Sequence, residues 1–137
     1  MMKRASLGSL TFEKAEFEGL EKMIVSLFPD SKITREKEDL FYKANLMNNS
    51  IGFLHLGKRK IGWKVIGIGV VPEYRDLGYG TEMLKFGIDL VRRMLGHSLS
   101  LSVEESNLEA INIYSKLGFR KIGKSGEKIK MMLVLNN

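Results

Sequence analysis

The chain contains no cysteine among its 137 residues, which excludes disulfides, thiolate metal sites and cysteine nucleophiles. Histidine is nearly as scarce, and the two present, His55 and His97, lie far apart in the sequence. We therefore expect no histidine-rich metal site. Neither histidine stands near a nucleophile that it could activate as the base of a hydrolytic triad. Both are interpreted as ordinary surface or partly buried residues.

Proline, repeats and linkers are also rare. Only Pro29 and Pro72 occur, and no internal repeat, low-complexity tract or linker interrupts the chain. A length of 137 residues with 44% hydrophobic and 28% charged residues is typical of one soluble globular domain. We therefore expect residues 1–137 to form a single domain.

Long apolar runs are missing. The longest, from Val65 to Val71 with its glycines, is too short to span a bilayer. No apolar stretch follows Lys3 and Arg4, as it would in a secretory signal. These absences favour a cytoplasmic protein without a membrane partner.

Positive charge is in excess, with a formal net charge of +6. A basic protein suits anionic partners, and on this ground both nucleic acid and a phosphorylated cofactor remain open. Lys and Arg are scattered, and their densest run, at residues 58–60, is typical of an exposed hairpin turn. Because the sequence has neither an aromatic-studded basic strand nor an obvious recognition helix, no nucleic-acid partner is expected.

Hydrophobic periodicity predicts a mixed α/β fold with the order strand, helix, three strands, helix, strand, helix and two strands. The helices are predicted at residues 17–28, 80–95 and 106–117, the last starting at a capping box in residues 106–109. The strands are predicted at residues 7–13, 40–47, 51–56, 61–71, 98–103, 119–122 and 129–135. Turns are expected at residues 48–50 and 124–126. The three strands from 40 to 71 have short connections and should pair as an antiparallel meander.

The stretch from Val70 to Thr81 is the most informative in the chain. A buried strand runs into a glycine-rich turn that opens a helix, so backbone N–H groups converge with the positive end of the helix dipole behind them. A phosphate fits there, Gly78 and Gly80 permit its close approach, and Arg75 can add a charge-assisted contact. The alternative is a plain strand-to-helix turn whose glycines only relieve steric crowding.

Two better-known phosphate-binding loops do not fit this stretch. The P-loop needs a lysine after its last glycine, but Gly80 is followed directly by Thr81. The dinucleotide fingerprint needs a third glycine where this chain has Pro72. Gly67 and Gly69 are instead expected to mark a distorted strand, a bulge or a close backbone approach.

A second informative stretch runs from Asn107 to Phe119. Asn107 and Tyr114 are seven residues apart, or two helical turns, so they share a helix face. Taken singly, Asn107 is explained as a polar residue of the first helical turn and Tyr114 as a core aromatic.

Together the two stretches resemble the GNAT superfamily of acyl-CoA N-acyltransferases. The signature (Q/R)-x-x-G-x-(G/A) is matched by residues 75–80, and the downstream pattern S-N-x-x-A-x-x-x-Y-x-x-x-G-F by residues 106–119. The resemblance covers residues 61–135 well and the first 60 residues only by element order. It implies a mixed, mostly antiparallel central sheet with a splayed parallel strand pair and flanking helices. It also implies acetyl-CoA as co-substrate, an amine acceptor, and no metal.

The resemblance further implies roles for individual residues. Tyr114 falls at the position of the general acid, and a tyrosine with a pKa of about 10 is a competent donor near neutral pH. Ser102 stands where relatives often carry a glutamate base. Glu104, on the same strand face, is the candidate base acting through water, and the alternative is a solvent-facing carboxylate at a strand end. The residues implied in acetyl-CoA binding are Ile68, Gly69, Val70, Arg75, Asp76, Leu77, Gly78, Tyr79, Gly80, Thr81 and Asn107.

Some questions stay open at this point. Asp76 departs from the family, in which many members carry a basic or small residue, so its carboxylate is expected to point away from the phosphates. A non-catalytic acyl-CoA-binding domain and a nucleic-acid-binding module are the competing interpretations. The acceptor is a protein N-terminus, a lysine, a polyamine or a small molecule, and the protein a monomer or a homodimer.

Overall fold

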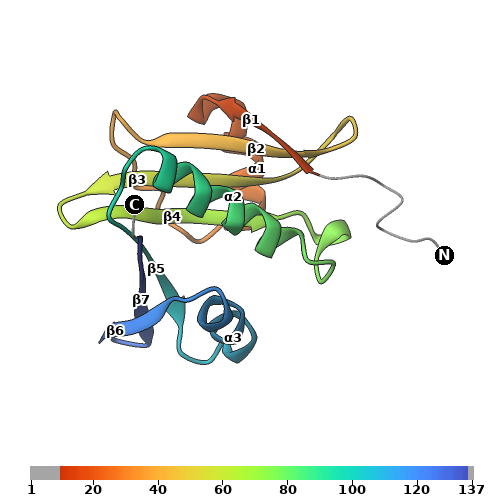
Figure 1. Cartoon of the computed structure of the whole chain (residues 1–137). Coiled ribbons are helices and arrows are strands. Elements are labelled where there is room, and N and C mark those ends of the chain that lie inside the picture. Colours follow the sequence, from red (N-terminus) through yellow and green to blue (C-terminus); the bar gives the residue numbers. More distant parts are fainter. Residues whose placement is uncertain (1–9, 136–137) are drawn as a thin grey trace. The chain divides into compact units, whose positions relative to one another are not determined.

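The structure is a computed structural model that describes residues 10–135. It has the expected order of elements, with one added 3₁₀ turn, η2 (Pro72–Tyr74) (Figure 1). The strands are β1 (Leu10–Ala15), β2 (Leu40–Leu46), β3 (Asn49–Arg59), β4 (Gly62–Val70), β5 (Ser98–Glu104), β6 (Arg120–Ser125) and β7 (Lys128–Val134). The helices are α1 (Phe17–Leu27), α2 (Tyr79–Arg93) and α3 (Leu108–Lys116). The part of the predicted strand 7–13 that precedes Leu10 lies outside the described residues.

Within residues 10–135 the strands form one sheet in the order β1-β2-β3-β4-β5-β7-β6. β1 with β2, β2 with β3, β5 with β7 and β6 with β7 pair antiparallel. β4 and β5 pair parallel, through Trp63 with Leu99 and Lys64 with Ser100. The predicted mixed, mostly antiparallel sheet with one parallel strand pair is confirmed. Among the described residues, no helix is long and apolar enough to cross a membrane.

The chain divides into two compact units. The first comprises the described chain up to Gly57 together with Ile66–Gly87, and the second comprises Lys58–Val65 together with the chain from Ile88 onward. The first unit thus contains β1, α1, β2, most of β3, the end of β4 and the start of α2. The second contains the rest of α2, β5, α3 and the β6–β7 hairpin.

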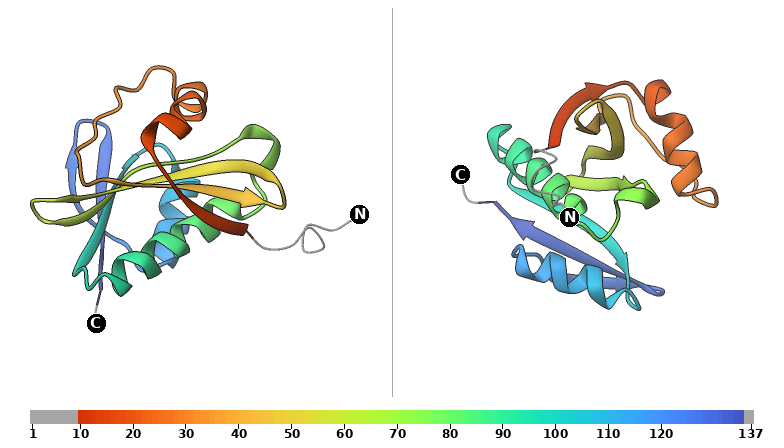
Figure 2. Two further views of the ribbon diagram at one scale, coloured as in Figure 1. Left: turned by 90° about the horizontal axis from the view of Figure 1, so that it is seen from above. Right: turned by 90° about the vertical axis from the view of Figure 1, so that its right-hand side faces the viewer.

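Helix α1 buries one face in the first unit. Its apolar residues recur at helical spacing and pack against aromatic residues of β2 and β3. Full burial of one such side chain is worth about 1.5–3 kcal/mol, so the cluster fixes the helix on these strands (Figure 2). The helix ends at Leu27, close to Pro29, as the sequence predicts. The buried members of the cluster are Phe17, Leu20, Ile24, Phe41 and Phe53.

In the second unit, β5 alternates apolar and polar side chains, and of the polar ones Ser98 and Ser100 are also buried. Leu99, Leu101 and Val103 are buried, as a period of two requires. Helix α3 lies beside the β6–β7 hairpin (Figure 2). It ends at Lys116 with Leu117 as its C-cap, and the next residue is Gly118, whose φ of +105° favours glycine and whose Cβ would come within 3.0 Å of the Leu133 side chain. The predicted end of this helix is confirmed.

Several predicted boundaries were wrong, among them the hairpin turn expected at residues 58–60, since β3 continues to Arg59 and the turn is at residues 60–61. The first hairpin turn is at residues 47–48 instead of 48–50, with Met47 in the left-handed region at φ +57°. The last turn is at residues 126–127 instead of 124–126, because Gly126 takes the left-handed position. The predicted capping box at residues 106–109 would place the N-cap of α3 at Ser106. The N-cap is instead Asn107, whose side-chain oxygen accepts a hydrogen bond from the Ala110 N–H at 3.2 Å.

Candidate active site

The end of β4 is held closely by its neighbours. A Cβ at Gly69 would lie 2.9 Å from the ring of Phe53 and 3.0 Å from the side chains of Leu27 and Phe28. A Cβ at Gly52 of β3 would run into the Gly69 carbonyl oxygen. The predicted close approach at this glycine is confirmed, although side chains as well as backbone make it. Residues 68–70, which the resemblance implies in acetyl-CoA binding, therefore sit in a fixed part of the first unit.

Beyond β4 the chain enters a loop with its own hydrogen bonds. The Val71 N–H donates to the Ile51 carbonyl at 2.8 Å, and the Tyr74 N–H donates to the Val71 carbonyl at 3.0 Å. Arg75 folds back, and its Nε donates to the Val70 carbonyl at 2.8 Å. Arg75 thus ties the loop to the end of β4, a structural role that the sequence did not indicate.

Two residues of the loop have positive φ angles. Gly78 has φ +87° and Asp76 has φ +61°. Aspartate is one of the few non-glycine residues that tolerate this left-handed conformation. The departure at Asp76 therefore has a backbone explanation, and its side chain is exposed.

The first turn of α2 supplies the donors expected for a phosphate. The Glu82 N–H bonds to the Gly78 carbonyl at 3.1 Å, so the N–H groups of residues 79–81 have no partner within the helix. A Cβ at Gly80 would meet only Val70, at 4.0 Å, so the space over this turn is open. Convergent N–H groups, a helix dipole and open space fit a pyrophosphate.

Two alternate residues of the loop, Leu77 and Tyr79, anchor it to the hydrophobic core. The side chains of Leu77 and Tyr79 pack in an apolar cluster with Leu10, Ile51 and Met83, among others. Tyr79 is 5% exposed, and its hydroxyl has no hydrogen-bond partner in the described part of the chain. We conclude that Leu77 and Tyr79 hold the loop from the core side.

Tyr114 lies on α3 in the second unit and is half-buried. Its ring packs against Phe119 with 6.0 Å between the centroids. Burial raises the pKa of the Tyr114 phenol above its ordinary value of 10.0. The hydroxyl is therefore protonated at neutral pH, the state that a general acid needs.

Asn107 and Glu104 stand at the junction of β5 and α3. The Asn107 N–H donates to the Glu104 carbonyl at 3.0 Å, while the Asn107 side-chain oxygen caps α3. Both residues are exposed, and so is Ser102. Glu104, Asn107 and Tyr114 thus belong to the β5–α3 segment of the second unit, whereas residues 68–81 belong to the first unit.

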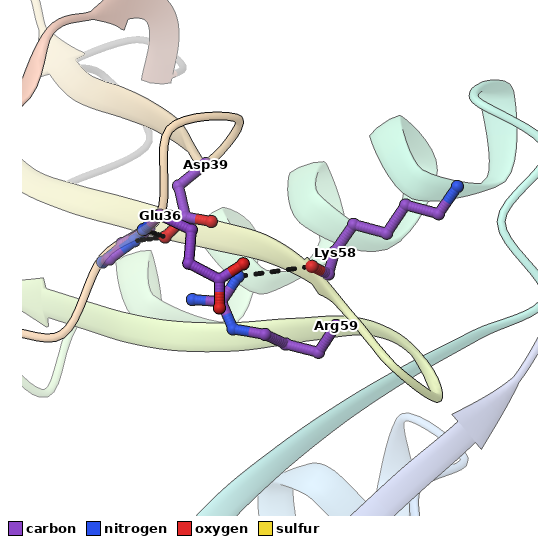
Figure 3. A network of polar contacts seen from close by, with 5 residues as sticks. Glu36, Asp39, Lys58 and Arg59 are labelled. Carbon is purple, nitrogen blue, oxygen red and sulfur yellow. Dashed lines mark hydrogen bonds and ion pairs between the residues drawn. The ribbon is translucent and has the colours of Figure 1, made fainter.

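A buried histidine–carboxylate contact in the first unit was not predicted. The His55 Nε2 lies 2.7 Å from Asp39 Oδ2, with side chains 3% and 1% exposed. The same Asp39 oxygen accepts from the Glu36 N–H at 3.1 Å, and Figure 3 shows Glu36 and Asp39 on the segment that precedes β2. The His55 ring stacks on Phe41, with 4.1 Å between the centroids. His55 is thus buried rather than a surface residue, and among residues 10–135 no group of three or more His, Asp or Glu could hold a metal ion.

Solved structures share this fold. The ribosomal-protein-S18-alanine N-acetyltransferase from Escherichia coli matches with a TM-score of 0.79 and 20% identity, over 94% of this chain and 96% of that chain. An acetyltransferase from Bacillus subtilis, solved in complex with CoA, matches with a TM-score of 0.80 and 17% identity, over 93% of this chain and 100% of that chain. At such identities the likeness establishes the fold.

Sequence comparison establishes the family. An N-alpha-acetyltransferase from Sulfurisphaera tokodaii is 37% identical over 59 residues, which make up 42% of this chain. The chain spans only 35% of the length of that curated relative. The model of the acetyltransferase (GNAT) family matches residues 9–119. The chain therefore belongs to the acetyltransferase (GNAT) family.

Proposed function

We propose that this enzyme transfers the acetyl group of acetyl-CoA to a primary amine by direct attack in a ternary complex. The observation that carries the proposal is the segment from Arg75 to Thr81, called the 75–81 loop. The Arg75 side chain ties this loop to the Val70 carbonyl, and the helix start offers N–H donors beside the open space at Gly80. The acceptor is a protein N-terminus, a lysine, a polyamine or a small molecule.

Two segments of the first unit, residues 68–70 and the 75–81 loop, have tasks in binding acetyl-CoA. The backbone of residues 68–70 pairs with the amide groups of the pantetheine arm, as an added strand would. The 75–81 loop holds the pyrophosphate through the N–H groups of its helix turn and the charge of Arg75. Asp76, being exposed, turns its carboxylate into solvent. In the second unit, Asn107 contacts the pantetheine arm.

The reaction forms a C–N bond and breaks the thioester C–S bond. A neutral amine attacks the carbonyl carbon, and a main-chain N–H of β4 stabilises the negative charge that develops on its oxygen. The leaving thiolate takes the phenolic proton of Tyr114, which solvent then replaces. Because burial raises the pKa of Tyr114, the donor is fully protonated at the pH of the reaction.

The amine must lose a proton as it attacks. Glu104 is the proposed acceptor of that proton, through a water molecule, because it is exposed at the end of β5. Ser102 lies two residues earlier on the same face and has no titratable group, so it cannot replace a carboxylate base.

A first test is the melting temperature in the presence of ligands. Acetyl-CoA should raise it through linkage between binding and folding, while free acetate and duplex DNA should not. If acetyl-CoA raises the melting temperature but no amine causes release of the CoA thiol, the protein is the non-catalytic acyl-CoA-binding domain. Absence of any shift at millimolar acetyl-CoA would contradict the proposed function as a whole.

A further inference from the structure

Strands β5 and β7 present one polar face in the second unit. Glu104 pairs with Lys128 in the antiparallel register, and Ser102 pairs with Lys130. Residues directly opposite in such a register project to the same side of the sheet. Glu104, Ser102 and Lys128 are exposed, and Lys130 is half-buried. The candidate base and the position where relatives carry a glutamate therefore each face a lysine across the strand pair.

This face carries an excess of positive charge. β6 adds Arg120, which pairs with Met132 of β7 and is exposed. The neighbouring acid Glu105 is neutralised by Lys124, with 2.7 Å between the charged atoms. Glu127, in the turn between β6 and β7, is another exposed acid beside this hairpin. On the face itself, one carboxylate stands among three cations, and we call it the lysine face, defined by Glu104, Ser102, Lys128, Lys130 and Arg120.

The charge of this face discriminates among amines. Any amine that hands its proton toward Glu104 brings the rest of its molecule near Lys128 and Lys130. Additional cations on that molecule, as in a polyamine, are repelled by the two lysines. A carboxylate or phosphate next to the amine is attracted by them. Glu104 is a single carboxylate, so it can pair with one ammonium group but not with the several ammonium groups of a polyamine.

We propose that the acceptor carries a negatively charged group close to its reacting amine and is not a polyamine. This inference rests on the proposed function, because it takes Glu104 as the group that the amine approaches. The shared chemistry is an anionic primary amine. It occurs both in a free acidic amino acid and in a peptide whose second residue is acidic, and the acceptor panel separates the two sources.

The test is a competition among matched acceptors. Peptides that begin with Ala and differ only in a second residue of Glu, Gln or Lys are compared with free glutamate and spermidine. We expect kcat/KM for the Glu peptide to exceed that for the Lys peptide by about tenfold at low salt, the size expected for a few exposed charge contacts. The preference should shrink as salt is raised, because these charges are exposed.

A charge reversal isolates the lysine face. Lys130→Glu should lower the ratio of Glu-peptide to Lys-peptide kcat/KM by about tenfold or invert it. Lys121→Glu is the matched control, because Lys121 pairs with Met131 on the other side of the same hairpin. Since the ratio is taken with one enzyme preparation, changes in acetyl-CoA affinity cancel. An unchanged ratio in Lys130→Glu, or an equal change in Lys121→Glu, overturns the inference.

Failure of the proposed function would give other results than failure of this inference alone. If acetyl-CoA does not bind, or if no amine is acetylated, the proposed function is contradicted. The lysine face is then judged by titrating C-terminally labelled Glu and Lys peptides in the presence of CoA, with anisotropy as the readout. Tighter binding of the Glu peptide, lost in Lys130→Glu, supports it, and equal binding of the two peptides overturns it. If the neutral peptide and spermidine are acetylated as well as the Glu peptide, only the inference falls.

Discussion

The 75–81 loop and the β5–α3 junction are built in different ways. The proposed role of the loop depends on its main chain, while its side chains, such as Leu77 and Tyr79, pack in the hydrophobic core. At the junction the side chains themselves are the candidates, and Asn107 already serves the fold as a helix cap. A site made of backbone needs glycines and a helix start at fixed spacing, which leave a pattern in sequence. A site made of side chains leaves a weaker pattern, because each residue has an ordinary structural explanation.

The largest effect should come from a side chain placed on the loop. Gly80→Val fills space that is open in the protein alone, so folding should be little affected. It should cost about 10²–10³-fold in acetyl-CoA affinity, because two or three hydrogen bonds to a charged group are displaced. Circular dichroism checks the fold and calorimetry the affinity. Normal affinity in a folded variant would show that the loop does not hold the phosphates.

A smaller effect should follow at Asp76. Asp76→Asn removes a negative charge beside the proposed pyrophosphate site and keeps a residue that tolerates φ +61°. Acetyl-CoA should bind about two- to fivefold more tightly at low salt, and the gain should fade as salt is raised. Asp89→Asn on α2 is the control, since it makes the same charge change on an exposed residue farther along the helix. An equal gain in acetyl-CoA affinity in both variants would show that the net charge of the protein, and not the position of Asp76, causes the tighter binding.

An effect of similar size to that at Asp76, on stability rather than affinity, should follow at Tyr79. The Tyr79 hydroxyl is buried without a partner among the described residues, which costs about 1–3 kcal/mol. Tyr79→Phe should therefore raise the free energy of unfolding by about 1 kcal/mol and leave acetyl-CoA affinity unchanged. Urea denaturation with and without acetyl-CoA measures both. A loss of stability would mean that the hydroxyl bonds to a group of the bound or folded state.

Much of the first unit's loop could be predicted from sequence. The strand, the glycines and the helix start follow from local patterns, and the boundaries of α1 and α2 agree within two residues or so. The positive φ of Asp76 and the bond from Arg75 to Val70 could not be predicted, because they depend on how the chain turns between β4 and α2.

The contact between Asp39 and His55 could not be predicted from the sequence. It depends on the register of β2 and β3, in which Phe41 lies opposite His55. That register follows from the position of the hairpin turn, which was predicted one residue or more too late. An error of one residue in the predicted position of a turn changes the predicted strand register. The contacts between distant side chains are then predicted wrongly as well.

The substitution Tyr114→Phe tests the proposed mechanism most directly. Tyr114→Phe keeps the ring that packs on Phe119 and removes only the hydroxyl. The account predicts that turnover with a working acceptor falls about 100-fold, the low end for a general acid, while acetyl-CoA affinity holds. Because the pKa of Tyr114 is raised above 10.0, the wild-type donor should stay active up to about pH 10.

The measurement is steady-state kinetics of Tyr114→Phe beside a direct titration with acetyl-CoA. Reduced kcat with unchanged affinity is the predicted result. A fall in kcat of less than about threefold would make Tyr114 a packing residue, since a proton donor contributes far more. A loss of affinity alone would make it a residue that positions the cofactor. Either of these results would contradict the assignment of the general acid.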